Sequence, residues 1–543
     1  MNSLALARPT AAQLAWHQME IEMFVHFGPA TWQEQDNDDL SLPPAKFNPT
    51  KLDTEQWCDV AESFGARQII LVAKHVGGFC LWQTDSSTYG LKQAAWRNGK
   101  GDIAADLAAS CQKRGLRLGM YLSPADKFLD AGIGGRCATP EAQDRYTATY
   151  RQQLTELLTR YGPISEIWFD GSLVFEVSDI VTRYAPDAIQ FQGPQASIRW
   201  AGNEEGILPY PAWNTLSTRD ARSGIATVAH SNPDGDAWLP LEVDTTLRGL
   251  HWGDKKDPQS ICWFWKTYNK SGLKSLDRLI ETYYRSVGHG AVLLLNSNPD
   301  TTGRIPREDV RRVAEFGNVI RERFSTPLAE TSGRGKTIEL AFPKPRRVDH
   351  VTTTEDITFG HRVRRYVIEG LISRKWKRLA SGTAIGYKKI DFFPAQKVAA
   401  IRFRAVESVA PPLINRLAAF HVGEIPTFDP NPPYIANPME LGTYGNKVTE
   451  EGTTITFDVS SPCGAARQYD LELIPAPGSA TVTVDSVQFI HDGADAPQFV
   501  TGTSNPLLWS ITVTGVGGTK SLSLRLRRTG QGEPKGTIVL RGR

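Results

Sequence analysis

The sequence predicts an α/β fold, a (β/α)8-like barrel followed by one or two C-terminal β-sandwich domains. The chain has 543 residues, far more than the roughly 150 of an average domain. Apolar runs of β-strand type alternate with helical patterns over the first 325 residues. Beyond residue 330 or so, short alternating strands continue without long helical patterns, which is typical of β-sandwiches.

The expected barrel strands are nearly continuous in Ile, Val and Leu, as in parallel strands buried on both faces. They lie at 22–28, 67–75, 116–124, 164–172, 187–194, 197–200, 239–244 and 291–296. Helical patterns, with apolar residues three or four apart, lie at 102–114, 141–161, 273–287 and 307–324. Repeated βα units favour a barrel. The alternative is a doubly wound open sheet, and the lack of G-x-G-x-x-G after the first strand disfavours it.

The change of pattern and a Pro-rich passage predict the domain boundaries. We expect a catalytic barrel at 1–328, a β-sandwich at 329–424, a Pro-rich linker at 425–439 and a second β-rich sandwich at 440–543. We expect the sandwiches to brace the barrel. The alternative is a sugar-binding role for Tyr366, Trp376 or Tyr387.

Composition excludes several classes of partner. Lys and Arg number 61 against 59 Asp and Glu, so a net charge of +2 gives no basis for binding nucleic acid through charge. No run of about 18 apolar residues could span a membrane, and no signal peptide is visible. We therefore expect a cytoplasmic protein, or a periplasmic or secreted one if a leader has been removed. Six scattered cysteines without C-x-x-C suggest buried thiols rather than disulfides or zinc ligands. The oligomeric state is not predicted.

The candidate site residues are polar side chains that close predicted strands. Active sites of (β/α)8 barrels lie at the carboxyl ends of the strands. The residues at these ends are His26, His75, Tyr121, Asp170 and Arg199, with Glu204 and Glu205 in the loop that follows Arg199. The sequence therefore predicts two carboxylates, two histidines and an arginine at one barrel mouth.

The carboxylates suit glycosyl chemistry. Asp170 ends an apolar run, EIWFDG, so it would be partly desolvated and placed to attack an anomeric carbon. The alternative is a buried Asp that caps a helix or pairs with Arg199. Glu204 or Glu205, in RWAGNEEG, could supply a general acid, or both could be a solvated pair at a loop tip.

His26 and His75 could be zinc ligands, hydrogen-bonding partners of sugar hydroxyls, or core histidines. No H-x-H occurs, and no further histidine closes a predicted strand. We therefore expect no metal and no cofactor.

Seven blocks, in order, resemble the α-L-fucosidases of glycoside hydrolase family 29. They are MFVHFGPATW, FNPTKLDTEQWCDVAESFGARQIILVAKHVGGFCLWQT, GLRLGMYLSPAD, EIWFDGS, IRWAGNEEG, LPLEVDTTL and SVGHGAVLLLNSNPDTTG. The resemblance implies a retaining exo-α-L-fucosidase whose partner is a fucosylated oligosaccharide. The RWAGNEEG and YLSPAD blocks are most similar to the subgroup that prefers α-1,3/1,4 linkages.

The resemblance also implies roles for individual residues. Asp170 corresponds to the nucleophile and Glu204 to the acid/base, with Glu205 as the fallback. Five residues correspond to the fucose pocket: His26, His75, Tyr121, Trp168 and Arg199.

The chain departs from the family pattern at several positions. Val76 and Gly77 replace the second His and the Asp of K-H-H-D-G-F, Ala125 replaces a Trp, and Asp36-Asn37 align with a family Glu-Trp. These changes bear on the sugar and leaving-group preferences. The alternatives are a glycosidase for another sugar, such as L-galactose, a metal-dependent hydrolase, or a non-catalytic glycan-binding protein.

Overall fold

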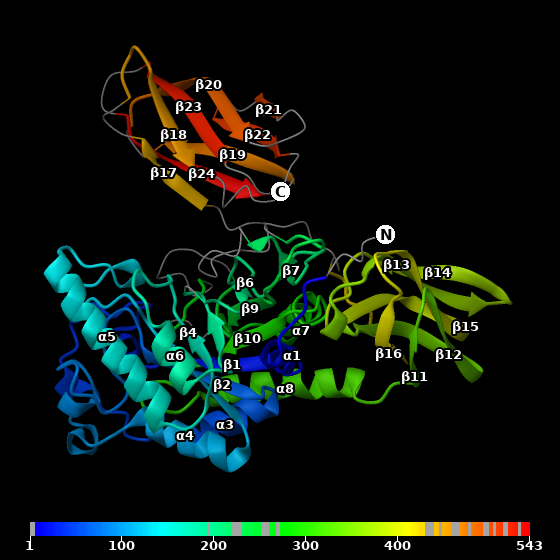
Figure 1. The fold of residues 1–543 in the computed structure, drawn as a ribbon, viewed down its shortest axis with the longest axis horizontal. Coiled ribbons are helices and arrows are strands. Elements are labelled where there is room, and N and C mark those ends of the chain that lie inside the picture. Colours follow the sequence, from blue (N-terminus) through cyan, green and yellow to red (C-terminus); the bar gives the residue numbers. More distant parts are fainter. Residues whose placement is uncertain are drawn as a thin grey trace. The chain divides into compact units, whose positions relative to one another are not determined.

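The structure is a computed structural model. It describes residues 6–542 except for 194, 219–230, 251–259, 268–271, 429–438, 445–447, 459–466, 476–478, 492–498, 503–506, 514–519 and 530–533. The chain divides into two compact units, Met1–Ile225 with Pro233–Pro430, and Ala226–Asn232 with Asn431–Arg543. Figure 1 shows the elements of each.

The first unit begins with a nearly closed parallel barrel. Its strands, in spatial order, are β1 (Ile21–Val25), β2 (Gln68–Lys74), β3 (Arg117–Leu122), β4 (Ile164–Trp168), β5 (Ile189–Phe191), β6 (Arg199–Trp200), β9 (Leu241–Thr246) and β10 (Val292–Asn296). Strand β10 pairs with β1, and an isolated bridge from Phe191 to Ile198 joins β5 to the residue before β6. The predicted (β/α)8-like barrel is therefore confirmed.

Helices surround this barrel (Figure 1). They are α1 (Ala11–His17), α2 (Pro29–Gln33), α3 (Thr54–Ser63), α4 (Ile103–Arg114), α5 (Pro140–Arg160), α6 (Ser178–Tyr184), α7 (Leu276–Arg285) and α8 (Arg307–Phe324). Asp102, Thr139 and Ser275 cap α4, α5 and α7 by accepting a backbone N–H from the third residue of the helix. None of the described helices is long and apolar enough to cross a membrane.

Alternation along the strands separates the barrel interior from the layer under the helices. Phe24, Ile70 and Leu294 belong to one buried cluster inside the barrel, whereas Met23 and Ile69 belong to a larger cluster with the helices. Successive side chains of a strand point to opposite faces. Residues two apart on a strand therefore form layers inside the barrel.

An antiparallel sheet completes the first unit. Its spatial order is β11 (Ala329–Arg334), β16 (Leu413–Phe420), β12 (Thr337–Glu355), β15 (Lys389–Ser408), β13 (Val363–Ile372) and β14 (Lys375–Gly382). Register shifts interrupt the pairing of the long strands β12 and β15, and such bulges bend strands. The predicted boundary at 328/329 lies within this unit, between α8 and β11.

The second unit consists of two antiparallel sheets over a core that includes Leu471, Leu524 and Ile538. One sheet has the order β17 (Met439–Tyr444), β24 (Gly536–Gly542), β19 (Arg467–Pro475), β22 (Leu508–Val513) and β21 (Phe499–Gly502), and the other β18 (Thr453–Asp458), β23 (Lys520–Arg528) and β20 (Val482–His491). These antiparallel sheets agree with the predicted β-sandwich tail. Most of the predicted linker, 429–438, lies outside the described residues.

The three aromatic residues considered for sugar binding in the tail are engaged by the fold. Tyr366 is fully buried, and its hydroxyl donates to Asp391. The Arg402 guanidinium lies 4.0 Å from the ring centre of Trp376. Tyr387 stacks on His17, with ring centroids 5.8 Å apart.

Candidate active site

Six of the seven predicted site residues line one small cavity at the carboxyl ends of the barrel strands. Its volume is about 120 Å³. The lining residues are Phe24, His26, His75, Tyr121, Trp168, Asp170, Phe191, Gln192, Trp200, Glu204, Asp244 and Trp263. Carboxylates, histidines and indoles from distant parts of the sequence thus share one space.

Asp170 follows β4 by two residues, so it continues the inward-facing series of Trp168. Its Oδ2 accepts a hydrogen bond of 3.0 Å from the Tyr121 hydroxyl. Gln192 Oε1 accepts the backbone N–H of Gly171 and Ser172, and the positive φ of 81° at Gly171 allows the sharp turn. Although Asp170 keeps solvent-accessible surface in the cavity, the surrounding protein desolvates its carboxyl and raises its pKa, while the bond from Tyr121 opposes that rise.

Glu204 enters the cavity from the loop after β6. Its Oε2 accepts a hydrogen bond of 2.6 Å from Nε1 of Trp263, and Thr245 Oγ1 donates to its main-chain carbonyl. Burial and the negative charge of Asp244 raise the pKa of Glu204 well above its ordinary range. The charge of Asp170 acts in the same direction. Glu205, the fallback candidate, does not line the cavity.

Both site histidines are neutral. Burial lowers the pKa of His26 well below its ordinary value and that of His75 to about 4. The Asn296 side chain donates to the carbonyl of Trp263, so its oxygen faces Nδ1 of His26, at 2.9 Å. Nδ1 of His26 therefore carries the proton, and Nε2 remains a hydrogen-bond acceptor.

Arg199 is the predicted site residue that lies elsewhere. It is fully buried, and its guanidinium donates to the carbonyl oxygens of Leu239 and Trp213. Its neighbour Trp200 lines the cavity instead. Because adjacent residues of a strand face opposite sides, only one of the two can point into the barrel mouth.

Three cavity residues, Trp200, Asp244 and Trp263, are not among the site residues predicted from the sequence. Asp244 closes the expected strand 239–244, so the rule applied to the other strands could have found it. Trp200 Nε1 donates to Asp244 at 2.7 Å, and burial raises the pKa of Asp244 to about 7. Trp263 lies in a loop, without any strand signal to mark it.

The departure at Gly77 has a structural counterpart. A Cβ on Gly77 would lie 2.4 Å from Cβ of Asp38, so the two side chains exclude each other. The Asp38 carboxylate accepts hydrogen bonds from Tyr89 at 2.7 Å and Gln33 at 2.8 Å. A carboxylate from the segment after α2 therefore occupies the space that a side chain at position 77 would need.

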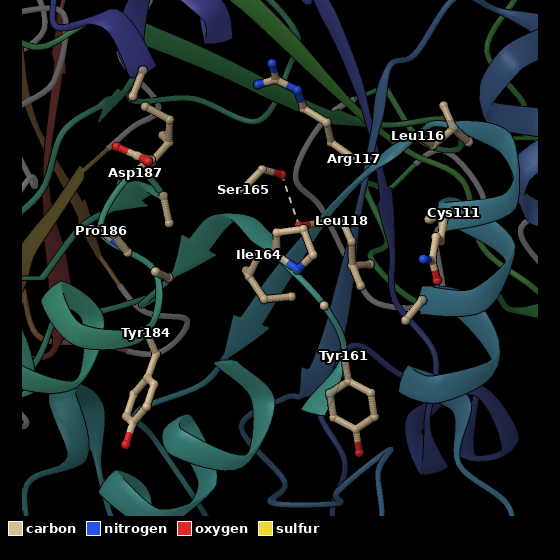
Figure 2. A pocket seen from close by; sticks show the side chains of 18 of the residues that line it. Cys111, Leu116, Arg117, Leu118, Tyr161, Ile164, Ser165, Tyr184, Pro186 and Asp187 are labelled. Carbon is tan, nitrogen blue, oxygen red and sulfur yellow. Dashed lines mark hydrogen bonds between the residues drawn. The ribbon is translucent and has the colours of Figure 1, made fainter. Parts of the chain in front are cut away.

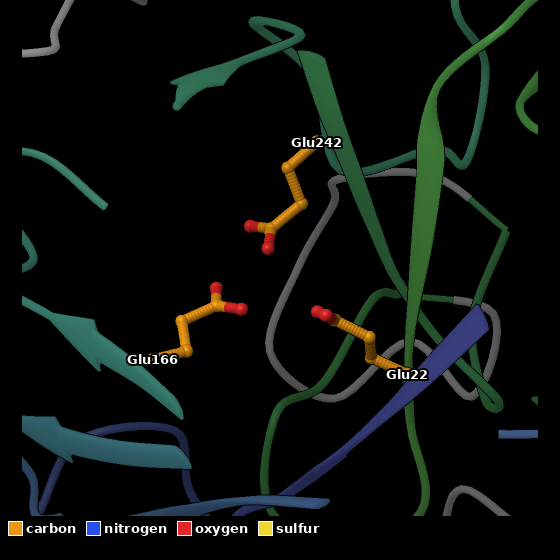
Figure 3. A group of neighbouring side chains, drawn as sticks. All are labelled: Glu22, Glu166 and Glu242. Atoms are coloured by element: carbon orange, nitrogen blue, oxygen red, sulfur yellow. The ribbon is translucent and has the colours of Figure 1, made fainter. Parts of the chain in front are cut away.

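One group among the described residues could hold a metal ion. Glu22, Glu166 and Glu242 point toward one another inside the barrel, with ligand atoms all within 4.8 Å (Figure 3). All three are fully buried. Each lies two residues before a cavity residue on its strand, so the group forms the layer next to the cavity.

The polar neighbours of this glutamate layer suit protons rather than a cation. Trp16, Gln68 and Trp168 each donate an N–H to Glu166, at 2.8 to 3.0 Å. Such donors favour a negative charge on Glu166, and they occupy most of the lone pairs that a cation would need. Burial raises the pKa of Glu22 and of Glu242 well above the ordinary range, and the charge of Glu166 adds to this. The protonated forms of these two carboxyls are therefore favoured over their ionised forms, and they can share protons with Glu166.

A larger groove of about 990 Å³ lies at the amino ends of β3, β4 and β5 (Figure 2). Its lining includes Arg117, Tyr161, Ser165, Tyr184 and Asp187, together with several alanines. None of the predicted site residues reaches it. Because barrel enzymes place their chemistry at the opposite ends of the strands, the smaller cavity is the candidate active site.

The sequence matches the family model described as Alpha-L-fucosidase over residues 10–323. The chain is 28% identical to Alpha-L-fucosidase 1 of Arabidopsis thaliana over 465 residues, which cover 76% of this chain and 88% of that protein. A crystal structure of a putative alpha-L-fucosidase from Bacteroides thetaiotaomicron superposes with a TM-score of 0.71 and 33% identity, covering 77% of this chain and 99% of the other.

Two further structures extend the comparison. A glycoside hydrolase 29 member from an unknown rumen bacterium matches 98% of this chain and 99% of its own, with a TM-score of 0.68 and 27% identity. A Ruminococcus gnavus GH29 fucosidase mutant in complex with fucose matches 77% of this chain and 96% of its own, with a TM-score of 0.67 and 25% identity. Since the family model spans more than half of the sequence and the likeness continues beyond the barrel, this chain belongs to the alpha-L-fucosidase family (GH29) and is a glycoside hydrolase.

Proposed function

We propose that the enzyme removes terminal α-linked L-fucose by double displacement, with Asp170 as nucleophile and Glu204 as acid/base. One observation carries this assignment: the two carboxyls line the same cavity, and their surroundings act on them differently. Asp170 receives a hydrogen bond from Tyr121 that favours its ionised form. Glu204 lies among other carboxylates that favour its protonated form. Burial raises both pKa values, but only that of Glu204 is raised further by neighbouring carboxylates. Surroundings that favour different charge forms of two carboxyls are what a nucleophile and a general acid require.

The proposed reaction proceeds in two steps. In the first, an oxygen of Asp170 forms a bond to the anomeric carbon while the glycosidic C–O bond breaks, and the Glu204 proton passes to the leaving oxygen. In the second, Glu204 takes a proton from water, whose oxygen attacks the anomeric carbon and releases Asp170. Both steps invert the anomeric carbon, so the configuration is retained.

The remaining cavity residues suit a neutral deoxy-sugar. Nε2 of His26 can accept a hydrogen bond from a sugar hydroxyl, and we assign similar contacts to His75 and Tyr121. Trp168 offers an apolar ring face, held by stacking on Phe191 with ring centroids 3.5 Å apart. We assign Arg199 a supporting role behind β6, because its guanidinium is committed to main-chain carbonyls.

Similarity in the RWAGNEEG and YLSPAD blocks supports an α-1,3/1,4 preference, with a fucosylated glycan as the natural substrate. Fucose release from 1,2-, 1,3-, 1,4- and 1,6-linked oligosaccharides tests the linkage. Faster release from the 1,2- or 1,6-linked compounds would contradict the preference without affecting the catalytic assignment.

Chemical rescue tests the nucleophile. Asp170→Gly should lower turnover of an aryl α-L-fucoside by several orders of magnitude, because no carboxylate remains to form the glycosyl-enzyme. Added azide, which fits the vacated space, should restore turnover and yield the β-fucosyl azide. Near-normal hydrolysis by the variant, or an α-azide product, would remove Asp170 from this role.

A further inference from the structure

The loop that carries Trp263 is fixed to the barrel through Asp36. Oδ1 of Asp36 accepts the backbone N–H of Trp263 at 2.9 Å, and Oδ2 pairs with Nζ of Lys266 at 2.8 Å. The Lys266 side chain is only 2% exposed, so this ion pair is screened little by solvent. One carboxylate therefore anchors the described loop, residues 260–267, at two points.

Other contacts orient the same tryptophan. Asn296 and Asn298 donate to its carbonyl oxygen. Its ring lies beside His26, with centroids 5.1 Å apart. Held in this way, the indole directs Nε1 to Oε2 of Glu204 at 2.6 Å. The position of the indole N–H thus depends on hydrogen bonds made by the main chain of Trp263, and Asp36 accepts one of them.

We propose that Asp36 is a positioning residue for the reaction, and that it acts through Trp263 to hold an indole N–H against the acid/base carboxyl of Glu204. This inference rests on the proposed role of Glu204. Asp36 is not among the residues that line the cavity. Its effect on catalysis must pass through the loop or act as a charge at a distance.

These two routes change the pKa of Glu204 in opposite directions. A hydrogen bond donated to a carboxylate favours its ionised form, so the Trp263 contact lowers the pKa of Glu204. The negative charge of Asp36, like those of Asp244 and Asp170, raises it. The two histidines of the cavity are neutral and add no charge.

The pH profile of kcat/KM separates the routes, because its alkaline limb reports the essential acid of the free enzyme. Trp263→Phe should move the alkaline limb to higher pH, because it removes the N–H. Asp36→Ala should move it in the same direction if Asp36 acts through the indole, and to lower pH if only its charge matters. The double variant should shift no further than Trp263→Phe alone.

The leaving group provides a second readout. Losing a hydrogen bond to a charged group should lower kcat/KM for an alkyl α-L-fucoside roughly 10- to 100-fold in both single variants. A 2-chloro-4-nitrophenyl fucoside, whose leaving group needs little protonation, should be affected much less. Asp39→Ala is the matched control, because Asp39 is an exposed aspartate of the same segment, and it should leave both readouts unchanged.

The inference is overturned if Asp36→Ala shifts the alkaline limb downward or not at all, or if the Asp36 and Trp263 effects add. Should Asp36→Ala fail to fold, Asp36→Ala/Lys266→Met removes both members of the ion pair, and the same upward shift is expected. Glu204→Ala tests the underlying role separately. If this variant does not discriminate against poor leaving groups, the acid/base assignment fails. If Glu204→Ala does discriminate against poor leaving groups, but Asp36→Ala and Trp263→Phe shift the alkaline limb in different directions, only the role proposed for Asp36 fails.

Discussion

At the scale of single residues, the neighbours of each site carboxyl determine whether its ionised or its protonated form is favoured. Asp170 and Glu204 share a cavity and each accepts a side-chain hydrogen bond, but the charges of neighbouring carboxylates act on Glu204. Loss of hydration raises both pKa values. The specific partners, rather than burial, therefore distinguish their proposed roles.

Tyr121→Phe tests this difference. Without the hydroxyl, the pKa of Asp170 should rise further, so the carboxylate needed for attack would be protonated up to a higher pH. The acidic limb of kcat/KM should therefore move to higher pH.

Tyr150→Phe is the control. Its hydroxyl donates to the Leu122 carbonyl at 2.7 Å, and it does not line the cavity. This variant should leave the pH profile unchanged. An unchanged acidic limb in Tyr121→Phe would show that the phenol does not set the charge state of Asp170.

At the scale of elements, strand alternation builds the barrel interior in layers. On β1, Glu22 and Phe24 face inward and His26 continues the series. On β4, Glu166 and Trp168 do the same, and Asp170 follows. The period of two thus places an acidic layer, an aromatic layer and the reacting groups one above another. The loops after the strands add Glu204 and Trp263.

Packing between two such loops can be tested at Gly77. Gly77→Ala should lower stability by about 1–3 kcal/mol, because the new Cβ overlaps Asp38. Asp38→Gly should also destabilise, by removing the acceptor of Tyr89. Thermal unfolding of Gly77→Ala/Asp38→Gly should give a smaller loss than the sum, because each change relieves the other. Additive losses would mean that the two positions are not in contact.

At the scale of the whole molecule, the glutamate layer links stability to pH. The folded-state pKa values of Glu22 and Glu242 lie well above the unfolded value. The folded state therefore binds more protons than the unfolded state once the pH exceeds about 4.5. Stability should fall as the pH rises from there toward the folded pKa values, by about 1.4 kcal/mol per pH unit for each such group.

Glu242→Gln should flatten this dependence, because an amide imitates the protonated carboxyl and can still donate to Glu166. Its melting temperature should exceed that of the unmodified protein by a margin that grows between pH 5 and pH 8. Glu166→Gln should behave differently, because the three N–H groups that converge on Glu166 would lose a charged acceptor, and it should destabilise across this range. A pH-independent difference for Glu242→Gln would contradict proton sharing.

Local pattern was sufficient for most of the barrel and for much of the candidate site. Runs of Ile, Val and Leu ending in His26, His75 or Asp170 marked strands and the residues at their ends, because strand composition and side-chain alternation are local properties. The carboxyl ends of parallel strands must meet, so the gathering of these residues followed from the fold class. Asp244 closes a predicted strand in the same way, so its place in the site was also predictable from local pattern.

Tertiary structure alone decided the rest. Whether Arg199 or Trp200 faces the cavity depends on the orientation of a two-residue strand, which its neighbours determine. Trp263 and Asp36 are 227 positions apart, and only the folded chain brings them to Glu204. The sequence likewise does not show that the Asp38 side chain fills the space that a side chain at position 77 would need. Periodicity encodes which face of an element is buried, whereas contacts between loops depend on where the whole barrel places them.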